Sequence, residues 1–251
     1  MKPYISIILP AYNESGRLPA ALDVIFPYMR YMHVGHEIIV VENGSTDDTY
    51  QIAESYQRKH PTVFPLRSRP GKGAAVRVGM LFASGYYRYM CDVDLSTPID
   101  MLPRFVSLAQ TGSPVVIGSR EAPGSIRYNE PGKRHTMGRM FNRAAQSLLI
   151  SGIRDSQCGF KLFRWDIAEQ LFGLQTVSGF AFDVEILYLA RQMGIRIAEL
   201  GVPWLYNDDS RVRPVRDALR MAWDVLKIKF RALSGAYDPK KVPEMAPVRF
   251  T

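Results

Sequence analysis

The sequence predicts an α/β fold with a mostly parallel central sheet and flanking helices, followed by a C-terminal amphipathic helical extension. Apolar runs of strand length alternate with segments of helical spacing through the first half of the chain, which is the pattern of βαβ units. Two runs, Ile5–Leu9 and Ile38–Val41, are almost continuously apolar, as expected for strands that helices cover on both faces. In such sheets ligands bind beyond the carboxyl ends of the strands, so functional residues should follow the apolar runs.

Each element follows from these patterns in turn. Strands are expected at the apolar runs Tyr4–Leu9, His36–Glu42, Thr62–Arg67, Tyr86–Asp92 and Pro114–Ser119. Helices are expected where apolar residues recur every three or four positions, at Leu18–Met32, Asp47–Lys59, Ala74–Ala83 and Ile99–Leu108. The step Asn43-Gly44 supplies a tight turn, and residues 45–48 are good helix starters.

Composition narrows the class of protein. The chain has 251 residues, 47% hydrophobic and 22% charged, which excludes a disordered or low-complexity protein. The longest uncharged run, Phe105–Ser119, is interrupted by Gly112 and Pro114 and falls short of the roughly 20 apolar residues of a membrane span. The first residues lead directly into a strand, which predicts no signal peptide, and two cysteines, Cys91 and Cys158, are too few for a disulfide framework. We therefore expect a cytoplasmic protein.

Basic charge is concentrated at the end of the chain. Residues 211–251 hold ten Lys/Arg and four Asp/Glu, whereas residues 1–210 hold 22 and 20, within a net charge of +8. A basic segment at one end favours a local anionic partner, such as an anionic membrane surface, over nucleic acid, for which the sequence carries no recognition motif. A solvated tail that aids solubility is the simpler alternative.

The pair Asp92-Val93-Asp94 follows the fourth expected strand. Two carboxylates two residues apart can both reach one hard cation, and Mg²⁺ or Mn²⁺ is usually shared between such carboxylates and substrate phosphates. The alternative is that both acids cap the helix that begins near Pro98.

Other loops along the same edge could bind a nucleotide. Lys72 lies between two glycines, in a loop that precedes a helix whose N-terminus favours anions. Glu14 and Glu42 follow the first two strands, where carboxylates can accept hydrogen bonds from a base or from ribose, and the ring of Tyr12 can stack on a base. Each could also be an ordinary surface residue. Neither a P-loop nor the dinucleotide-binding glycine motif is present, which argues against a nicotinamide dehydrogenase.

Taken in order, these segments resemble the inverting glycosyltransferases of family 2, which have the GT-A fold. The resemblance rests on Pro10-Ala11-Tyr12-Asn13-Glu14, Glu42-Asn43-Gly44-Ser45-Thr46-Asp47, Gly71-Lys72-Gly73 and Asp92-Val93-Asp94. Segments of the second half are similar to the dolichyl-phosphate glucosyltransferase branch, and dolichyl-phosphate mannose synthases share much of the pattern: Gly118-Ser119-Arg120, residues 153–163, residues 182–188, Val202-Pro203-Trp204 and Ser210-Arg211. The chain departs from the family at Glu42, where an Asp is usual.

The resemblance implies transfer of a hexose from a nucleotide sugar to a polyprenyl phosphate, with inversion and with Mg²⁺ or Mn²⁺ as cofactor. Glucose from UDP-glucose is favoured, and GDP-mannose is the other donor considered. The residues implied to bind the nucleotide sugar are Pro10, Tyr12, Glu14, Glu42, Lys72, Asp92, Asp94 and Arg211. Asp92 and Asp94 would hold the metal, and Arg211 would close over the diphosphate.

Arg120 and Arg134 are candidates for the acceptor phosphate, since two guanidinium groups suit a phosphate dianion; Arg134 could equally be a solvated residue at a helix start. A phosphate acceptor is already ionised near neutral pH, so Asp183 is expected to orient Arg120 or Lys161 and to remove no proton. The rival is transfer to a hydroxyl of a lipid or saccharide, which needs a base.

The chain is thus expected to comprise a GT-A domain at residues 1–210 and a basic amphipathic extension at residues 211–251. One face of the extension's helix holds Arg216, Arg220, Asp224, Lys227 and Arg231, and another holds Val215, Leu219, Trp223, Leu226, Phe230 and Leu233. This pattern predicts a basic helix on the cytoplasmic surface of a membrane. A helix packed on the domain with a solvated basic face is the alternative.

Overall fold

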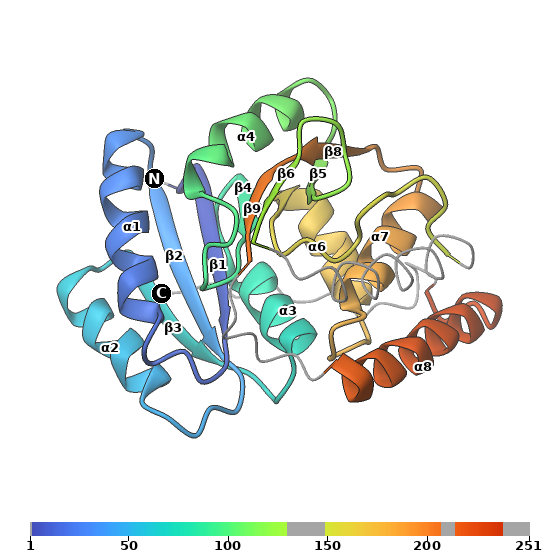
Figure 1. Cartoon of the computed structure of the whole chain (residues 1–251), viewed down its shortest axis with the longest axis horizontal. Coiled ribbons are helices and arrows are strands. Elements are labelled where there is room, and N and C mark those ends of the chain that lie inside the picture. Colours follow the sequence, from blue (N-terminus) through green and yellow to red (C-terminus); the bar gives the residue numbers. More distant parts are fainter. Residues whose placement is uncertain (1, 130–148, 207–213, 238–251) are drawn as a thin grey trace.

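A seven-stranded sheet forms the centre of the computed structural model, which describes residues 2–129, 149–206 and 214–237 (Figure 1). The strands lie in the order β3-β2-β1-β4-β7-β5-β8. Neighbours pair in parallel, except that β7 is antiparallel to both β4 and β5. The bounds are β1 Ile5–Ala11, β2 His36–Glu42, β3 Val63–Arg67, β4 Tyr87–Met90, β5 Val115–Ser119, β7 Lys161–Arg164 and β8 Ile197–Gly201. The expected α/β fold with a mostly parallel sheet is confirmed.

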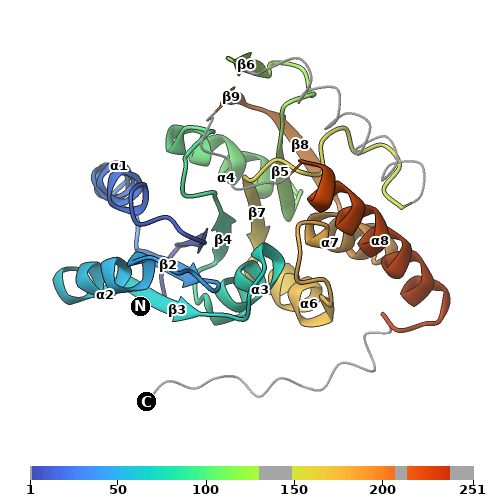
Figure 2. The ribbon, with the colours of Figure 1, turned by 60° about the horizontal axis from the view of Figure 1, so that its bottom comes forward.

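Helices cover both faces of this sheet. Their bounds are α1 Leu18–Tyr31, α2 Thr49–Lys59, α3 Lys72–Phe82, the 3₁₀ helix η1 Ile99–Met101, α4 Leu102–Gln110, α6 Trp165–Leu174, α7 Phe182–Gln192 and α8 Pro214–Leu233. Figure 2 shows α1 and α4 on one face and α3, α6 and α7 on the other. None of the helices in the described part of the chain combines the length and the hydropathy that a membrane span requires.

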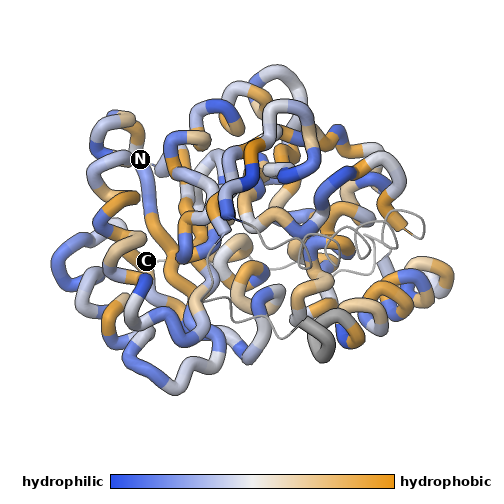
Figure 3. The backbone as a smooth tube through the Cα atoms, viewed as in Figure 1, coloured by the Kyte–Doolittle hydropathy of each residue, from blue (hydrophilic) through white to orange (hydrophobic). Residues whose placement is uncertain are grey.

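Both faces of the sheet are buried because successive strand residues point to opposite sides. In β2, Ile38 and Val40 belong to the buried cluster on the side of α1 and α4, whereas Ile39 and Val41 belong to the cluster on the side of α3 and α7. β1 divides in the same way, with Ile8 on the α3 side. The apolar colouring of these strands in Figure 3 follows from this double burial, as the continuous apolar runs predict.

The parallel strands end together at one edge of the sheet. In register, Ala11 of β1 lies beside Glu42 of β2, and Glu42 lies beside Arg67 of β3. β4 pairs with β1 up to Met90, so Asp92 and the residues after it lie at the same edge. All loops that the sequence singled out in the first half of the chain therefore meet there.

Two short strands form a separate small sheet beyond this edge. β6 (Ile126–Tyr128) follows β5, and β9 (Pro203–Leu205) follows β8, and the two pair in parallel as a separate sheet. β5 and β8 are themselves parallel neighbours. The small sheet is therefore a continuation past the carboxyl ends of these two strands.

The expected elements of the first half are all present, with shifted ends. The helix expected from Ala74 begins at Lys72, so Lys72 and Gly73 belong to the first turn of α3 and not to a loop before it. The strand expected to reach Asp92 ends at Met90. The helix expected at Ile99–Leu108 consists of η1 and α4.

α8 packs on the domain by one side and exposes an apolar row on the other. Val225 and Ile228 are buried in the core cluster of α3, α6 and α7, and Met221 packs against it. Each residue of a helix turns about 100°, which puts these three opposite the apolar row of the sequence analysis. The described members of that row are all exposed: Leu219 at 69%, Trp223 at 60%, Leu226 at 41%, Phe230 at 70% and Leu233 at 77%. The side chains of Val215 and Arg216 lie outside the described residues.

Candidate active site

The loops that follow β1 and β2 are joined by side-chain hydrogen bonds. Asn43 donates from Nδ2 to the carbonyl of Ala11 (2.8 Å), and its Oδ1 accepts from the N–H of Gly71 (3.3 Å). Gly71 has φ +123°, a conformation that suits glycine and that L side chains rarely adopt. One buried amide thus fixes three loops of the edge relative to one another.

Asp47 also connects the loop after β1 to the start of α2. Its carboxylate accepts hydrogen bonds from the N–H of Ser15 (3.0 Å) and the N–H of Thr49 (3.1 Å). Burial opposes ionisation, but the hydrogen bonds from Thr49 and Ser15 outweigh it and lower the pKa of Asp47 to about 2. The charged form of Asp47 is therefore part of the folded loop.

Glu14 and Glu42 are both buried at this edge, each with local partners. Arg17 forms a bidentate ion pair with Glu14, with both N–O distances at 2.6 Å. Glu42 accepts a hydrogen bond from the backbone N–H of Ser45, and its other oxygen lies 3.9 Å from Arg67. Their expected contacts with a nucleoside stay predictions.

Two further residues expected at the nucleoside lie beside them. Pro10 is half-buried within β1, next to the strand's end. Tyr12 follows the strand with 43% of its surface exposed. A large ring that remains accessible beside Glu42 could stack on a base.

The two aspartates after β4 meet Lys72 at the first turn of α3. The ammonium of Lys72 lies 2.6 Å from Oδ1 of Asp92. Burial alone would lower the pKa of Lys72, but Asp92 and Asp183 outweigh it, and the pKa is raised. Asp94 accepts a hydrogen bond from the N–H of Ser96 (3.0 Å), yet burial and the charge of Asp92 raise its pKa. Negative charge is thus gathered where the sequence predicts a cation.

This donor set fits a hard divalent ion. The two carboxylates are the oxygen ligands that Mg²⁺ and Mn²⁺ prefer, and such ions usually take their remaining ligands from water and substrate phosphates. Within the described residues no group of three or more His, Cys, Asp and Glu side chains gathers to hold a metal. An ion held by Asp92 and Asp94 would have ligand positions left for water and a diphosphate.

Gly159 packs directly on the carboxylate of Asp92. A Cβ atom at Gly159 would stand 1.9 Å from Oδ2 and 2.5 Å from Cγ of Asp92. Only a glycine can occupy this position while Asp92 keeps its place. The segment that precedes β7 thus forms a wall of the candidate metal site, a contact that the sequence analysis did not foresee.

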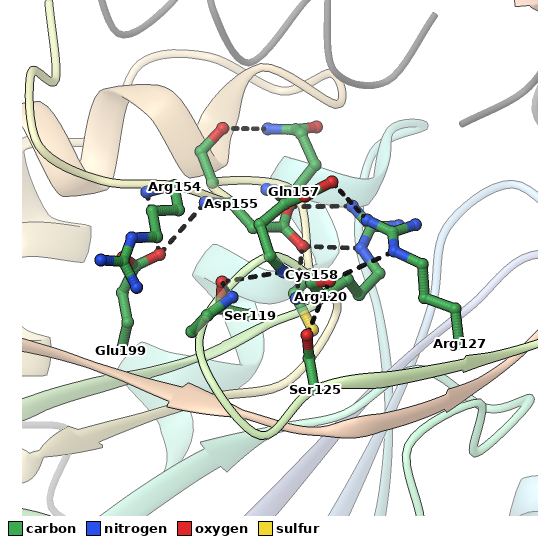
Figure 4. Close-up of polar contacts among 12 residues, drawn as sticks. Ser119, Arg120, Ser125, Arg127, Arg154, Asp155, Gln157, Cys158 and Glu199 are labelled. Atoms are coloured by element: carbon green, nitrogen blue, oxygen red, sulfur yellow. Dashed lines mark hydrogen bonds and ion pairs between the residues drawn. The ribbon is translucent and has the colours of Figure 1, made fainter. Parts of the chain in front are cut away.

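Asp155, in the same segment before β7, binds Arg120, which is the first candidate for contacting the acceptor phosphate. Asp155, which is fully buried, binds the guanidinium of Arg120 through Nε (2.6 Å) and Nη2 (2.9 Å), and also accepts from its backbone N–H (3.0 Å) (Figure 4). Burial opposes ionisation of Asp155, but Arg120 dominates and lowers its pKa. The guanidinium also lies 5.3 Å from the ring centroid of Trp204. Arg120 is therefore held in one orientation.

Asp183 pairs with Lys161, one of the two partners expected for it. The Lys161 ammonium lies 2.7 Å from Oδ1 of Asp183 and donates to the carbonyl of Cys158 at 2.5 Å. Both side chains are almost fully buried. Burial raises the pKa of Asp183, against the opposing charges of Lys161 and Lys72. Asp183 binds Lys161, whereas Arg120 is bound by Asp155.

The remaining candidates of the sequence analysis are two arginines and two cysteines. Arg134 and Arg211 fall outside the described residues. Cys91 and Cys158 are buried, and burial raises the pKa of both thiols, that of Cys158 to about 11. Neither thiol therefore has the ionised character of a nucleophile.

Known proteins resemble the chain over most of its length. The model of the family described as Glycosyl transferase family 2 matches residues 6–172. A Dictyostelium discoideum protein named dolichyl-phosphate beta-glucosyltransferase is 34% identical over 252 residues, covering 94% of this chain and 77% of that protein. The Homo sapiens protein of the same name is 32% identical over 257 residues, covering 96% and 79%.

Solved structures share the fold. Glucosyl-3-phosphoglycerate synthase from Mycobacterium tuberculosis in complex with UDP superposes with a TM-score of 0.64 at 22% identity, over 97% of this chain and 82% of the other. The same enzyme in complex with Mn²⁺, UDP-glucose and phosphoglyceric acid gives a TM-score of 0.65 at 22% identity, over 97% and 81%.

Proposed function

The chain belongs to glycosyl transferase family 2, a glycosyltransferase family with the GT-A fold, and on that premise we propose that it transfers glucose from UDP-glucose to the phosphate of a polyprenyl lipid such as dolichyl phosphate, with inversion. The observation that carries this proposal is the 34% identity, across 94% of the chain, with a protein named dolichyl-phosphate beta-glucosyltransferase. The UDP-glucose bound by a protein of the same fold supports the choice of donor.

The donor would lie along the carboxyl edge of the sheet. Tyr12 and Glu42 would contact the nucleoside, with Pro10 and Glu14 beside them. Asp92 and Asp94 would hold Mg²⁺ or Mn²⁺, whose charge stabilises the leaving nucleoside diphosphate when the ion is bound. Lys72 begins a helix, where its ammonium and the backbone N–H groups both favour a phosphate.

The charge pairing on the acceptor side favours a phosphate acceptor over a hydroxyl. A phosphate monoester has a second pKa of about 6 and is largely a dianion at neutral pH, so it needs cations to hold it and no base to activate it. Asp155 and Asp183 each already hold a cation, Arg120 and Lys161 respectively. Arg120 lowers the pKa of Asp155, which makes that carboxylate a poor proton acceptor. Asp183 is expected to act by holding the Lys161 ammonium in place. The acceptor phosphate would be bound by Arg120 and Arg134, and the diphosphate by Arg211. Arg134 and Arg211 lie outside the described residues.

We also propose that α8 attaches the enzyme to the cytoplasmic surface of an anionic membrane. An apolar row on the side of α8 that faces away from the domain has no role in the domain's own core, and such exposed rows mark interaction sites. Arg220, Lys227 and Arg231 lie along one flank of this row, which suits anionic headgroups beside an apolar layer.

Assays with a panel of donors test the reaction. Purified enzyme, Mg²⁺ or Mn²⁺ and a prenyl phosphate are incubated in turn with UDP-glucose, UDP-N-acetylglucosamine and GDP-mannose, and the lipid product is identified by mass spectrometry. We expect a hexosyl-phosphate lipid with UDP-glucose. Product with GDP-mannose alone would overturn the assignment of the donor, and no product with any donor would overturn the function.

Flotation with liposomes tests the attachment. Wild-type protein should float with vesicles that contain anionic lipid, and Trp223→Ser with Phe230→Ser should remain in the soluble fraction. Tyr31→Ser is the matched control, since Tyr31 is 77% exposed on α1 and its loss should not alter flotation. Equal flotation of all three proteins would contradict the role of α8.

A further inference from the structure

A shallow apolar pocket lies between the loop after Asp94 and the small sheet of β6 and β9. Its volume is about 300 Å³, and its lining offers almost no polar surface. The lining residues are Ser96, Pro98, Tyr128, Pro203, Trp204 and Leu205. None of the donor contacts proposed above involves this pocket.

One face of the small sheet is apolar and exposed beside this pocket. Tyr128 pairs in register with Leu205, and Ile126 pairs with Pro203, so these four residues lie on the same face. Leu205 is 53% exposed, Ile126 is 52% exposed and Tyr128 is 46% exposed. Moving apolar groups out of water lowers the free energy. A cluster of exposed apolar side chains is therefore suited to bind an apolar ligand.

The walls of the pocket contact both halves of the candidate active site. Trp204 lies between Pro203 and Leu205 in β9, so its side chain is on the other face of the small sheet, where its ring centroid lies 5.3 Å from the Arg120 guanidinium. Ser96, which also lines the pocket, donates its N–H to Asp94 and accepts at its carbonyl from the N–H of Leu205 (2.8 Å). A ligand in the pocket would therefore reach the loop of Asp94 at Ser96 and would lay its apolar end along β9, with Arg120 on the far side of Trp204.

We propose that this pocket binds the first isoprene units of the lipid acceptor and so brings its phosphate to the edge of the candidate active site. The inference rests on the proposed function, because it supplies the subsite for that acceptor's chain. A sugar or nucleotide is a poor occupant, since burying hydroxyls against an apolar lining loses hydrogen bonds to water without replacement. The pocket lies at the lower end of the roughly 300–1,000 Å³ range of small-molecule sites, so only the first part of the chain is held.

Chain-length dependence tests the pocket. Acceptor KM and binding by calorimetry are measured with prenyl phosphates of one, two, three and four isoprene units, below their micellar concentrations. For the wild type, KM and Kd should fall with the first units and then level off. Leu205→Ser, alone or with Tyr128→Ser, should flatten this series and weaken binding of the longer acceptors by about tenfold, with the KM for UDP-glucose unchanged.

Val24→Ser is the matched control, because Val24 is 51% exposed on α1, far in the fold from the small sheet. This variant should keep the wild-type series. If Leu205→Ser also keeps it while transfer proceeds, the pocket is not the chain's subsite and the proposed function stands. If prenyl phosphates bind with the expected length dependence but no hexose is transferred, the pocket stands and the proposed function is wrong. If the wild type binds none of them, both fail.

Discussion

Replacing Gly159 by alanine tests whether the close contact between Gly159 and Asp92 sets the position of the Asp92 carboxylate. The new methyl group would stand 1.9 Å from Oδ2 of Asp92, whereas ordinary contacts begin at 3.4 Å, so the carboxylate must withdraw by about 1.5 Å. That shift breaks the 2.6 Å pair with Lys72 and moves a proposed metal ligand.

The structure predicts a large loss of activity and a small loss of stability. A misplacement of about 1 Å in a catalytic arrangement can cost roughly 100-fold in rate, which corresponds to about 2.7 kcal/mol of transition-state stabilisation. The Lys72–Asp92 pair is partly exposed, so its loss should change the free energy of unfolding by at most about 1 kcal/mol.

The assay compares kcat/KM for UDP-glucose, Mn²⁺ affinity by electron paramagnetic resonance and thermal unfolding. Gly16→Ala is the control, because nothing lies within 4 Å of a Cβ atom at Gly16, and it should behave as wild type. Wild-type kcat/KM and Mn²⁺ affinity in Gly159→Ala would refute the claim that Gly159 sets the position of Asp92.

Four further variants, each at one charged residue, have predicted outcomes. Asp94→Asn should retain the fold but lose turnover and Mn²⁺ binding; full activity in EDTA, or normal turnover in this variant, would show that no metal is used. Lys161→Met leaves the buried Asp183 carboxylate without its cation and should destabilise the protein by about 3–5 kcal/mol in chemical denaturation, whereas Asp183→Asn should keep measurable transfer because no proton is removed there; complete loss of transfer in folded Asp183→Asn would favour the hydroxyl-acceptor rival. The folded pKa of Asp47, about 2, lies below its unfolded value, so Asp47 stabilises the fold fully above about pH 4 and loses this contribution as the pH falls toward 2. Asp47→Asn should therefore be less stable than wild type at pH 7, with the difference shrinking below pH 4; a constant difference would contradict the assigned cause.

The first half of the fold is predictable because its information is local. Alternating strand and helix patterns give the elements, and parallel pairing brings their carboxyl ends together, as Asp92 and Glu42 illustrate. α3 begins two residues before the expected Ala74 because its N-cap is Gly71, which lacks the side-chain oxygen that usually marks a helix start.

The second half depends on contacts between residues distant in sequence. β7 begins with Lys161, whose charge interrupts the apolar pattern expected of a buried strand. Lys161 can be buried because it pairs with Asp183, a contact that the sequence alone does not reveal. The contact of Gly159 with Asp92 likewise depends on antiparallel pairing of β7 with β4. For α8, periodicity reveals the apolar row but not that Val225 and Ile228, on the opposite side, are the residues that meet the domain.

The central claim is that hexose is transferred to a phosphate oxygen, and one comparison of acceptors tests it most directly. UDP-glucose and Mn²⁺ are supplied with a prenyl phosphate or with the prenyl alcohol of the same chain length, and the products are identified by mass spectrometry, with the anomeric configuration determined by NMR. We expect a β-linked glucosyl phosphate from the prenyl phosphate and no product from the alcohol. A glucoside formed on the alcohol, with the phosphate unused, would contradict the proposed reaction.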